Sequence, residues 1–236
     1  MCRLSRRSRE LFDFESAAYA AGHHRPAGVD EAGRGPLAGP VVAACVVLPG
    51  SKEAPPVRDP VWQGLTDSKL LSSAARARCV ARLRAWPGVA IGIGWATVAE
   101  IVRLNILRAT HLAMRRAVMR VRPLPDFLLV DGRPVPDLPV ASRAIVGGDR
   151  RCLSIAAASV IAKVVRDRYM QGLDRRYPGY GFAIHKGYGT RLHLDALERL
   201  GPTPVHRSTF GPVAALFAHS STHPRNSTST VDNGCA

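Results

Sequence analysis

The chain has 236 residues, 46% of them hydrophobic, which is enough for one large domain with a substantial core. Its formal net charge of +15 points to a polyanionic partner, nucleic acid or an anionic membrane surface. Five cysteines without a CxxC pair argue against a disulfide framework or a structural zinc site. No apolar run suits a membrane span or a signal peptide, so we expect a cytoplasmic protein with no membrane role.

The first half of the chain predicts strands between helices. Residues 1–26 are basic and then Ala-rich, which indicates an extension with one short helix around 8–21. Strands are expected at 27–30 and 41–48, paired antiparallel, because both runs are rich in β-branched residues. After a Pro-rich loop, a helix is predicted at 74–85, with Ser72 or Ser73 as its capping residue.

The second half continues the alternation. Further strands are predicted at 89–95, 127–130 and 143–146, and helices at 100–120, 155–170 and 193–200. Segment 177–191 is predicted to be a Gly/Tyr-rich loop, 213–217 a short apolar piece, and 219–236 a disordered polar tail. This order predicts an α/β catalytic domain over 27–218, with a mixed sheet flanked by helices and a C-terminal helical portion.

Four acidic residues share one local setting, because each follows a short apolar run and adjoins Gly or another acid: Asp30, Glu31, Asp131 and Asp149. Sheet scaffolds place reactive groups at such strand ends. Clustered carboxylates repel one another, and divalent cations remove that cost. Oxygen ligands without His or Cys favour Mg²⁺ or Mn²⁺, and a pair of such ions suits in-line displacement at phosphorus.

Each acid taken alone is also explained by a solvated turn. Side chains alternate faces along a strand, so Asp30 and Glu31 serve one site only if the strand ends or twists there. A further acid, Asp167, is expected to form a solvated ion pair with Arg166 and Arg168 at a helix end.

Three segments suggest contacts with a nucleic acid. Gly33-Arg34-Gly35 allows close backbone approach and adds one cation, which suits a ribose 2′-hydroxyl that both donates and accepts. Tyr188, with Lys186 nearby, is an aromatic plate in a flexible basic loop. Ser68 and Lys69 precede a helix, where a hydroxyl, an amide and an ammonium can meet a phosphate. A packing tyrosine and a polar turn are the alternatives for the last two.

Seven motifs in order resemble ribonuclease HII over residues 27–217: GVDEAGRGPLAGPVV, LTDSKLLS, LLVDGRPVP, VGGD, AAASVIAKVVRDR, FAIHKGYGT and STFGPV. The resemblance implies an RNase H-like fold. It also implies an endoribonuclease that cleaves the RNA strand of RNA–DNA hybrids and nicks 5′ to single ribonucleotides in duplex DNA. Two-metal-ion catalysis with Mn²⁺ or Mg²⁺ would leave a 3′-hydroxyl and a 5′-phosphate.

The resemblance also assigns roles to residues. Asp30, Glu31, Asp131 and Asp149 match the metal-binding and catalytic carboxylates. Gly33, Arg34 and Gly35 match the triplet that reads the ribose 2′-hydroxyl, Tyr188 matches a tyrosine that packs against the adjoining sugar, and Lys69 falls in a segment near a substrate phosphate. Ribonuclease HIII is less similar, because it usually carries Gly-Thr-Gly or Gly-Ser-Gly at positions 33–35.

Two other functions stay open at this point. The chain could be an RNase H-like nuclease that acts on DNA alone, or a non-catalytic hybrid-binding module whose carboxylates serve structure. We expect the protein to be a monomer.

Overall fold

The computed structural model describes residues 11–50, 65 and 72–220, with the side chains of 217–220 left aside. Ser68, Lys69 and the tail beyond Ser220 lie outside this part. No helix within it is long and apolar enough to cross a bilayer.

A five-stranded mixed sheet forms the centre of the fold, in the order β3-β2-β1-β4-β5. Its strands are β1 (Pro26–Ala32), β2 (Val41–Val47), β3 (Ala90–Ala96), β4 (Phe127–Asp131) and β5 (Ser142–Ile145). Strand β2 pairs antiparallel with β1 and β3, whereas β4 runs parallel to β1 and β5. The predicted α/β class, the mixed sheet and the five strands are confirmed.

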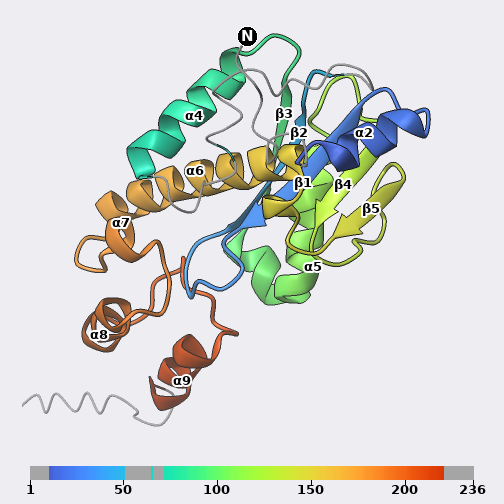
Figure 1. Ribbon diagram of the computed structural model, residues 1–236. Helices are drawn as coiled ribbons and strands as arrows, with labels where there is room; N and C mark the ends of the chain where they lie inside the picture. Colours follow the sequence, from blue (N-terminus) through green and yellow to red (C-terminus); the bar gives the residue numbers. More distant parts are fainter. Residues whose placement is uncertain (1–10, 51–64, 66–71, 221–236) are drawn as a thin grey trace, which may run out of the picture.

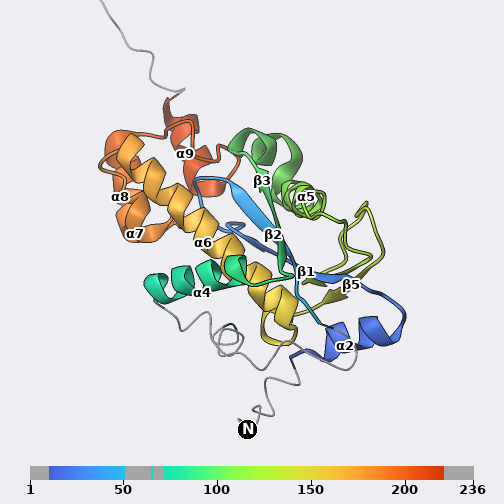
Figure 2. The ribbon, with the colours of Figure 1, turned by 90° about the horizontal axis from the view of Figure 1, so that it is seen from above.

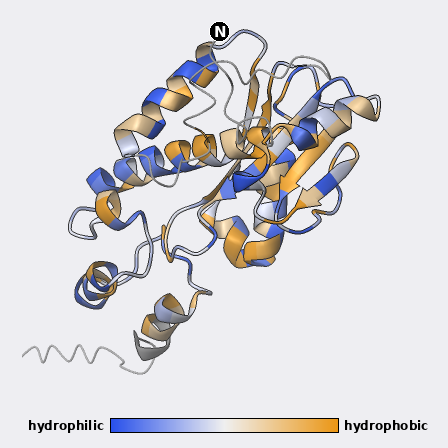
Figure 3. Cartoon of the chain, in the orientation of Figure 1, coloured by the Kyte–Doolittle hydropathy of each residue, from blue (hydrophilic) through white to orange (hydrophobic). Residues whose placement is uncertain are grey.

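Helices cover both faces of this sheet (Figures 1 and 2). Helix α6 (Leu153–Arg176) and α4 (Ser73–Ala85) pack on one face, and α5 (Val98–Val118) packs on the other. Alternate residues of β2 enter the two cores, so Val46 contributes to the α6 side and Val47 to the α5 side. Burial on both faces explains why β2 is a continuous apolar run. Figure 3 shows the apolar residues concentrated on the strands and on α5.

Glycine lets α6 lie directly against β1. A Cβ atom on Gly28 would lie 2.1 Å from the carbonyl carbon of Ser154 at the start of α6. The short helix predicted near the N-terminus is α2 (Asp13–Ala20). Its buried Glu15 accepts a hydrogen bond from the Ser154 amide (2.7 Å), so α2 supplies a cap for α6.

The predicted helix at 100–120 is present but interrupted. α5 begins earlier, because Thr97 and Glu100 form a capping box. Asn105 then leaves helical geometry (φ 67°), and its side-chain oxygen accepts from the amides of Leu107 and Arg108. A sequence pattern of apolar residues carries no sign of this break, because the apolar face continues on both sides of it.

The C-terminal part forms a separate small layer beside the sheet (Figure 1). It contains α7 (Phe182–His185), α8 (Arg191–Leu200) and α9 (Gly211–Ser220), which pack around Phe182 and Leu37. The predicted loop 177–191 therefore holds one helical turn, and the apolar piece 213–217 belongs to a longer helix. Likewise α6 continues past the predicted end at 170 to Arg176.

Candidate active site

Asp30 and Glu31 lie near the end of the central strand β1. The strand stays in register with β2 through Ala32, two residues beyond the predicted end at residue 30. Asp30 is buried on the α6 side, where the Ser159 side chain bonds to its carboxylate. Glu31 follows on the opposite side, and its amide donates to Asp30 Oδ1 (2.7 Å). The charge of Glu31 nevertheless acts on the Asp30 carboxylate, so the two acids belong to one electrostatic cluster although they leave the strand on opposite sides.

Asp131 ends the neighbouring parallel strand. Val29 pairs with Val130, so Asp131 follows directly after the last pair of the ladder, beside Asp30. Its Oδ1 accepts a hydrogen bond from the Gly148 amide (2.6 Å). The pKa of Asp30 is raised well above its ordinary value, chiefly by burial and then by the charges of Glu31 and Asp131. The structure thus brings three of the predicted acids into one electrostatic cluster.

Asp149 follows Gly148, whose amide binds Asp131. It belongs to a short 3₁₀ turn (Gly148–Arg150), lies 3.8 Å from Arg150 Nε, and is not among the charges that raise the pKa of Asp30. Within the described ranges, no three acidic, His or Cys side chains converge closely enough to ligate one ion.

A hollow of about 410 Å³ opens beside these acids. It is lined by Glu31, the Gly33–Gly35 loop, Tyr188 and three cationic side chains, Arg76, Lys163 and Arg166. A Cβ atom on Gly35 would lie 3.7 Å from Tyr188 Cε1, so the Gly33–Gly35 loop and the tyrosine ring lie next to each other in the wall of the hollow. Arg34 Nη1 binds Glu31 Oε1 (3.1 Å), which joins the loop to the acidic cluster.

A second hollow of about 560 Å³ lies on the other side of the Glu31–Arg34 pair. Asp131, Arg133 and His111 of α5 contribute to its lining. Burial and the charge of Arg34 lower the pKa of His111. The acidic cluster therefore lies between two openings, an arrangement that suits an extended polymer better than a small enclosed ligand.

Comparison with known proteins assigns the family. A family model described as Ribonuclease HII matches residues 27–213, which include the acids, the loop and the tyrosine. The chain belongs to the ribonuclease HII family. It is an endonuclease of the RNase H type, and the resemblance seen in the sequence is confirmed.

Curated relatives agree over most of the chain. The ribonuclease HII of Granulibacter bethesdensis is 58% identical over 192 residues, which span 81% of this chain and 86% of that one. The enzyme of the same name from Geobacillus kaustophilus is 51% identical over 214 residues, or 91% of this chain and 78% of that one.

Solved structures share the fold. Ribonuclease H2 of Pyrococcus horikoshii superposes with a TM-score of 0.68 at 24% identity, covering 85% of this chain and all of that one. Bst-RNase HIII in complex with Mn²⁺ gives a TM-score of 0.66 at 17% identity, over 94% of this chain and 75% of that one. The predicted RNase H-like fold of this ribonuclease HII is therefore confirmed.

Two lysines of this ribonuclease HII lie differently with respect to the hollow. Lys186 does not line the 410 Å³ hollow, and its ammonium instead donates to the carbonyl of Ala183. Lys163 lines it, with Nζ 6.0 Å from the Tyr188 ring centroid. Lys163 was missed because it lies in an apolar helix. The signal was present in the i, i+4 spacing of Ser159, Lys163 and Asp167, a polar stripe on that helix.

The expected solvated ion pair of Asp167 with its arginine neighbours is wrong. α6 continues past this point, so Asp167 is buried and binds Lys163 Nζ (2.8 Å). Arg166 is buried too and donates to backbone carbonyls of Ala38 and Pro40. Arg207, equally buried, was not singled out from sequence at all, because a single arginine among loop residues has no pattern that predicts burial.

Proposed function

We propose that this ribonuclease HII hydrolyses the RNA strand of RNA–DNA hybrids and nicks 5′ to single ribonucleotides in duplex DNA. The products would carry a 3′-hydroxyl and a 5′-phosphate. One observation carries the proposal: the cluster of Asp30, Glu31 and Asp131 adjoins a hollow walled by the Gly33–Gly35 backbone and by Tyr188. Phosphodiester chemistry and recognition of a sugar can therefore take place side by side.

The ribonuclease HII family uses divalent metal ions, and the acids here fit such ions by the chemistry of their donors, although within the described ranges no three of them converge on one point. Asp30, Glu31 and Asp131 offer hard oxygen donors, and burial together with the charges of Glu31 and Asp131 raises the pKa of Asp30. We propose these three as the Mg²⁺ or Mn²⁺ ligands, with Asp149 as a fourth. When bound, two such ions would neutralise charge at the scissile phosphate and supply an activated water. Bst-RNase HIII, which shares the fold, has been solved with Mn²⁺.

The remaining residues of the hollow would orient the substrate. The exposed backbone of Arg34 and Gly35 suits the ribose hydroxyl, and Tyr188, which is 44% exposed, offers its ring to the adjoining sugar. Lys163 and Arg76 stand where phosphates of the strand would pass. Ser68 and Lys69, outside the described residues, remain predicted phosphate contacts, and Lys186 remains a predicted substrate contact.

A labelled DNA duplex with one ribonucleotide tests this function directly, with Mg²⁺ and Mn²⁺ in separate reactions. We expect one nick 5′ to the ribonucleotide and none in the all-DNA duplex of the same sequence. Asp131→Asn should abolish the nick while leaving duplex binding measurable. Cutting of the all-DNA duplex would instead identify a DNA nuclease. Binding without any nick from folded protein would identify a hybrid-binding module.

We further propose a monomer that acts in the cytoplasm on these nucleic acids, without a membrane partner. The three described cysteines, Cys45, Cys79 and Cys152, are free thiols, which suits a reducing compartment. The division into an extension (1–26), a catalytic domain (27–218) and a polar tail (219–236) stays a prediction. Light scattering on the full chain would report the oligomeric state.

A further inference from the structure

A buried guanidinium lies directly behind the loop that lines the hollow. Arg207 Nη2 donates to the carbonyl of Gly33 (2.6 Å) and Nη1 to that of Arg34 (2.8 Å). Nε and Nη2 also donate to the carbonyl of Gly39 (3.0 and 2.8 Å). One side chain therefore binds two consecutive carbonyls at the start of the connection between β1 and β2, and a third, that of Gly39, near the end of this connection.

Arg207 forms these bonds without an acidic partner among the described residues, and the Phe210 ring lies 5.0 Å from its Cζ. Burial and the nearby charge of Arg166 lower its pKa to about 9, so the group is charged at neutral pH, although burial opposes that charge. A cation kept in such surroundings is costly, and only bonds to otherwise unsatisfied buried carbonyls offset that cost.

The geometry of the trans peptide bond determines where the amides of this loop point. Peptide bonds at 33–34 and 34–35 are trans, so the N–H of Arg34 points opposite to the Gly33 carbonyl, and the N–H of Gly35 opposite to the Arg34 carbonyl. Both carbonyls point inward to Arg207, and both amides therefore point outward. Gly33 is buried whereas Arg34 and Gly35 are exposed, in agreement with that direction. Neither amide donates to a protein acceptor in the described part of the chain.

We propose that Arg207 is a positioning residue for substrate recognition: by holding the carbonyls of Gly33 and Arg34, it aims the amides of Arg34 and Gly35 at the ribose 2′-hydroxyl. This inference rests on the proposed function. It assigns a role to Arg207, which is distant in sequence, because its bonds to the carbonyls leave the amides of Arg34 and Gly35 free to bind the sugar. Lysine cannot replace it, because an ammonium lacks the planar fork that spans three carbonyls.

The test compares Arg207→Lys with the wild type in metal-free buffer, where nothing is cleaved. Fluorescence anisotropy measures affinity for two duplexes that differ only in one 2′-hydroxyl. We expect the ribo-to-deoxy affinity ratio to fall roughly tenfold, the effect of about one lost hydrogen bond, with all-DNA affinity unchanged. In ¹⁵N spectra of the wild type, the amide signals of Arg34 and Gly35 should shift with the ribonucleotide duplex and much less with the all-DNA duplex.

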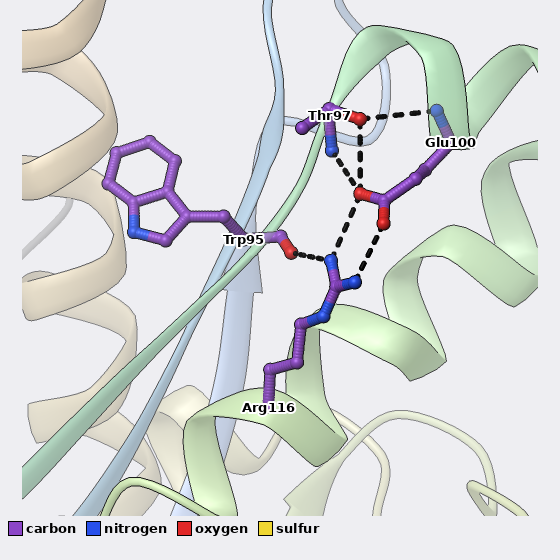
Figure 4. Close-up of polar contacts among 4 residues, drawn as sticks. All are labelled: Trp95, Thr97, Glu100 and Arg116. Carbon is purple, nitrogen blue, oxygen red and sulfur yellow. Dashed lines mark hydrogen bonds and ion pairs between the residues drawn. The ribbon is translucent and has the colours of Figure 1, made fainter.

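Arg116→Lys is the matched control (Figure 4). Arg116 also donates to a backbone carbonyl, that of Trp95 (2.7 Å), and it binds Glu100, but it lies on α5 away from the hollow. Its variant should melt at a lower temperature than wild type with an unchanged ribo-to-deoxy ratio. This outcome separates a loss of positioning from a general loss of stability.

The possible results are distinguishable. If the wild type shows no preference for the ribonucleotide duplex, the proposed function fails. If the wild type discriminates and folded Arg207→Lys discriminates equally, the role of Arg207 is overturned. If Arg207→Lys does not fold, Phe210→Leu decides, because it removes the ring beside the guanidinium. A ratio lowered about threefold supports the proposal and an unchanged ratio overturns it.

Discussion

The Nε2 atoms of His193 and His206 lie 3.1 Å apart inside the C-terminal layer. The Thr203 amide donates to Nδ1 of His206 (2.9 Å), so the proton of His206 is on Nε2 and points at His193. His193 must then carry its own proton on Nδ1, which donates to the carbonyl of Tyr188 (2.9 Å). Two neutral histidines with fixed tautomers therefore connect a loop before α9 to the backbone of the tyrosine in the hollow.

Acid should destabilise this connection. Burial lowers the pKa of both His193 and His206 to about 4, whereas the unfolded chain takes up protons near 6.5. Between these values the unfolded state binds more protons, so stability is present above about pH 6.5 and is lost as pH falls toward 4. Shifts of this size correspond to on the order of 3 kcal/mol per histidine. Thermal melting from pH 7.5 to 4.5 measures the loss.

Two variants test whether the histidine pair causes this pH dependence of stability. His206→Phe removes one titrating partner and should flatten the pH dependence, although it lowers stability at pH 7 by about 1–3 kcal/mol because the Thr203 amide loses its acceptor. His24→Gln changes an exposed histidine and should leave the profile as in wild type. A melting temperature that is equal at pH 5 and pH 7 in the wild type would contradict the neutral pair.

The glycines of the 33–35 loop should respond very differently to alanine. At Gly33 a Cβ atom would lie 2.1 Å from Arg166 Nε, and its φ of +97° disfavours any side chain, so Gly33→Ala should cost about 2–4 kcal/mol. At Gly35 the nearest atom is Tyr188 Cε1 at 3.7 Å, so Gly35→Ala should change unfolding free energy by less than about 0.5 kcal/mol. Urea denaturation compares the two. Equal losses would show that the packing of Arg166 behind Gly33 does not matter.

Removing one acid from the cluster should raise the stability of the metal-free protein and lower its activity. Asp30→Asn eliminates a buried charge beside Glu31 and Asp131, so the metal-free protein should gain about 1 kcal/mol. Cleavage should fall at least about a hundredfold, since one proposed metal ligand is lost. Melting in chelator and the nicking assay measure the two effects. Asp195→Asn, at an exposed pair with Arg191, should alter neither, and a less stable Asp30→Asn would argue against repulsion in the cluster.

Lys163 should contribute affinity without sequence or sugar preference. Lys163→Gln removes a cation from the hollow and should weaken binding to hybrid and all-DNA duplexes alike. The slope of log affinity against log salt should decrease by about 1, because one phosphate contact is lost. Titrations at several salt concentrations test this prediction. Arg103→Gln, on the exposed face of α5, is the control that should keep the wild-type slope. A ribo-specific loss would instead place Lys163 at the sugar.

Local pattern was sufficient for most of the fold. Apolar runs predicted the strands at β1, β2 and β4, because a strand buried on both faces of a sheet reads as a short continuous apolar segment. The same local reasoning missed the break at Asn105 and the turn of α7. These features depend on side-chain capping and on packing against distant segments.

The amino-acid sequence by itself determined the family, the acids at the strand ends and the Gly-Arg-Gly loop, because motif and spacing are properties of the chain alone. Only the tertiary structure decided what surrounds them. It buried Arg207 and Arg166 behind that loop, placed Tyr188 against Gly35, and put Lys163, which the sequence analysis did not single out, in the hollow. These contacts join residues far apart in sequence, and their energies come from burial and from carbonyls left without other partners, which no local pattern records.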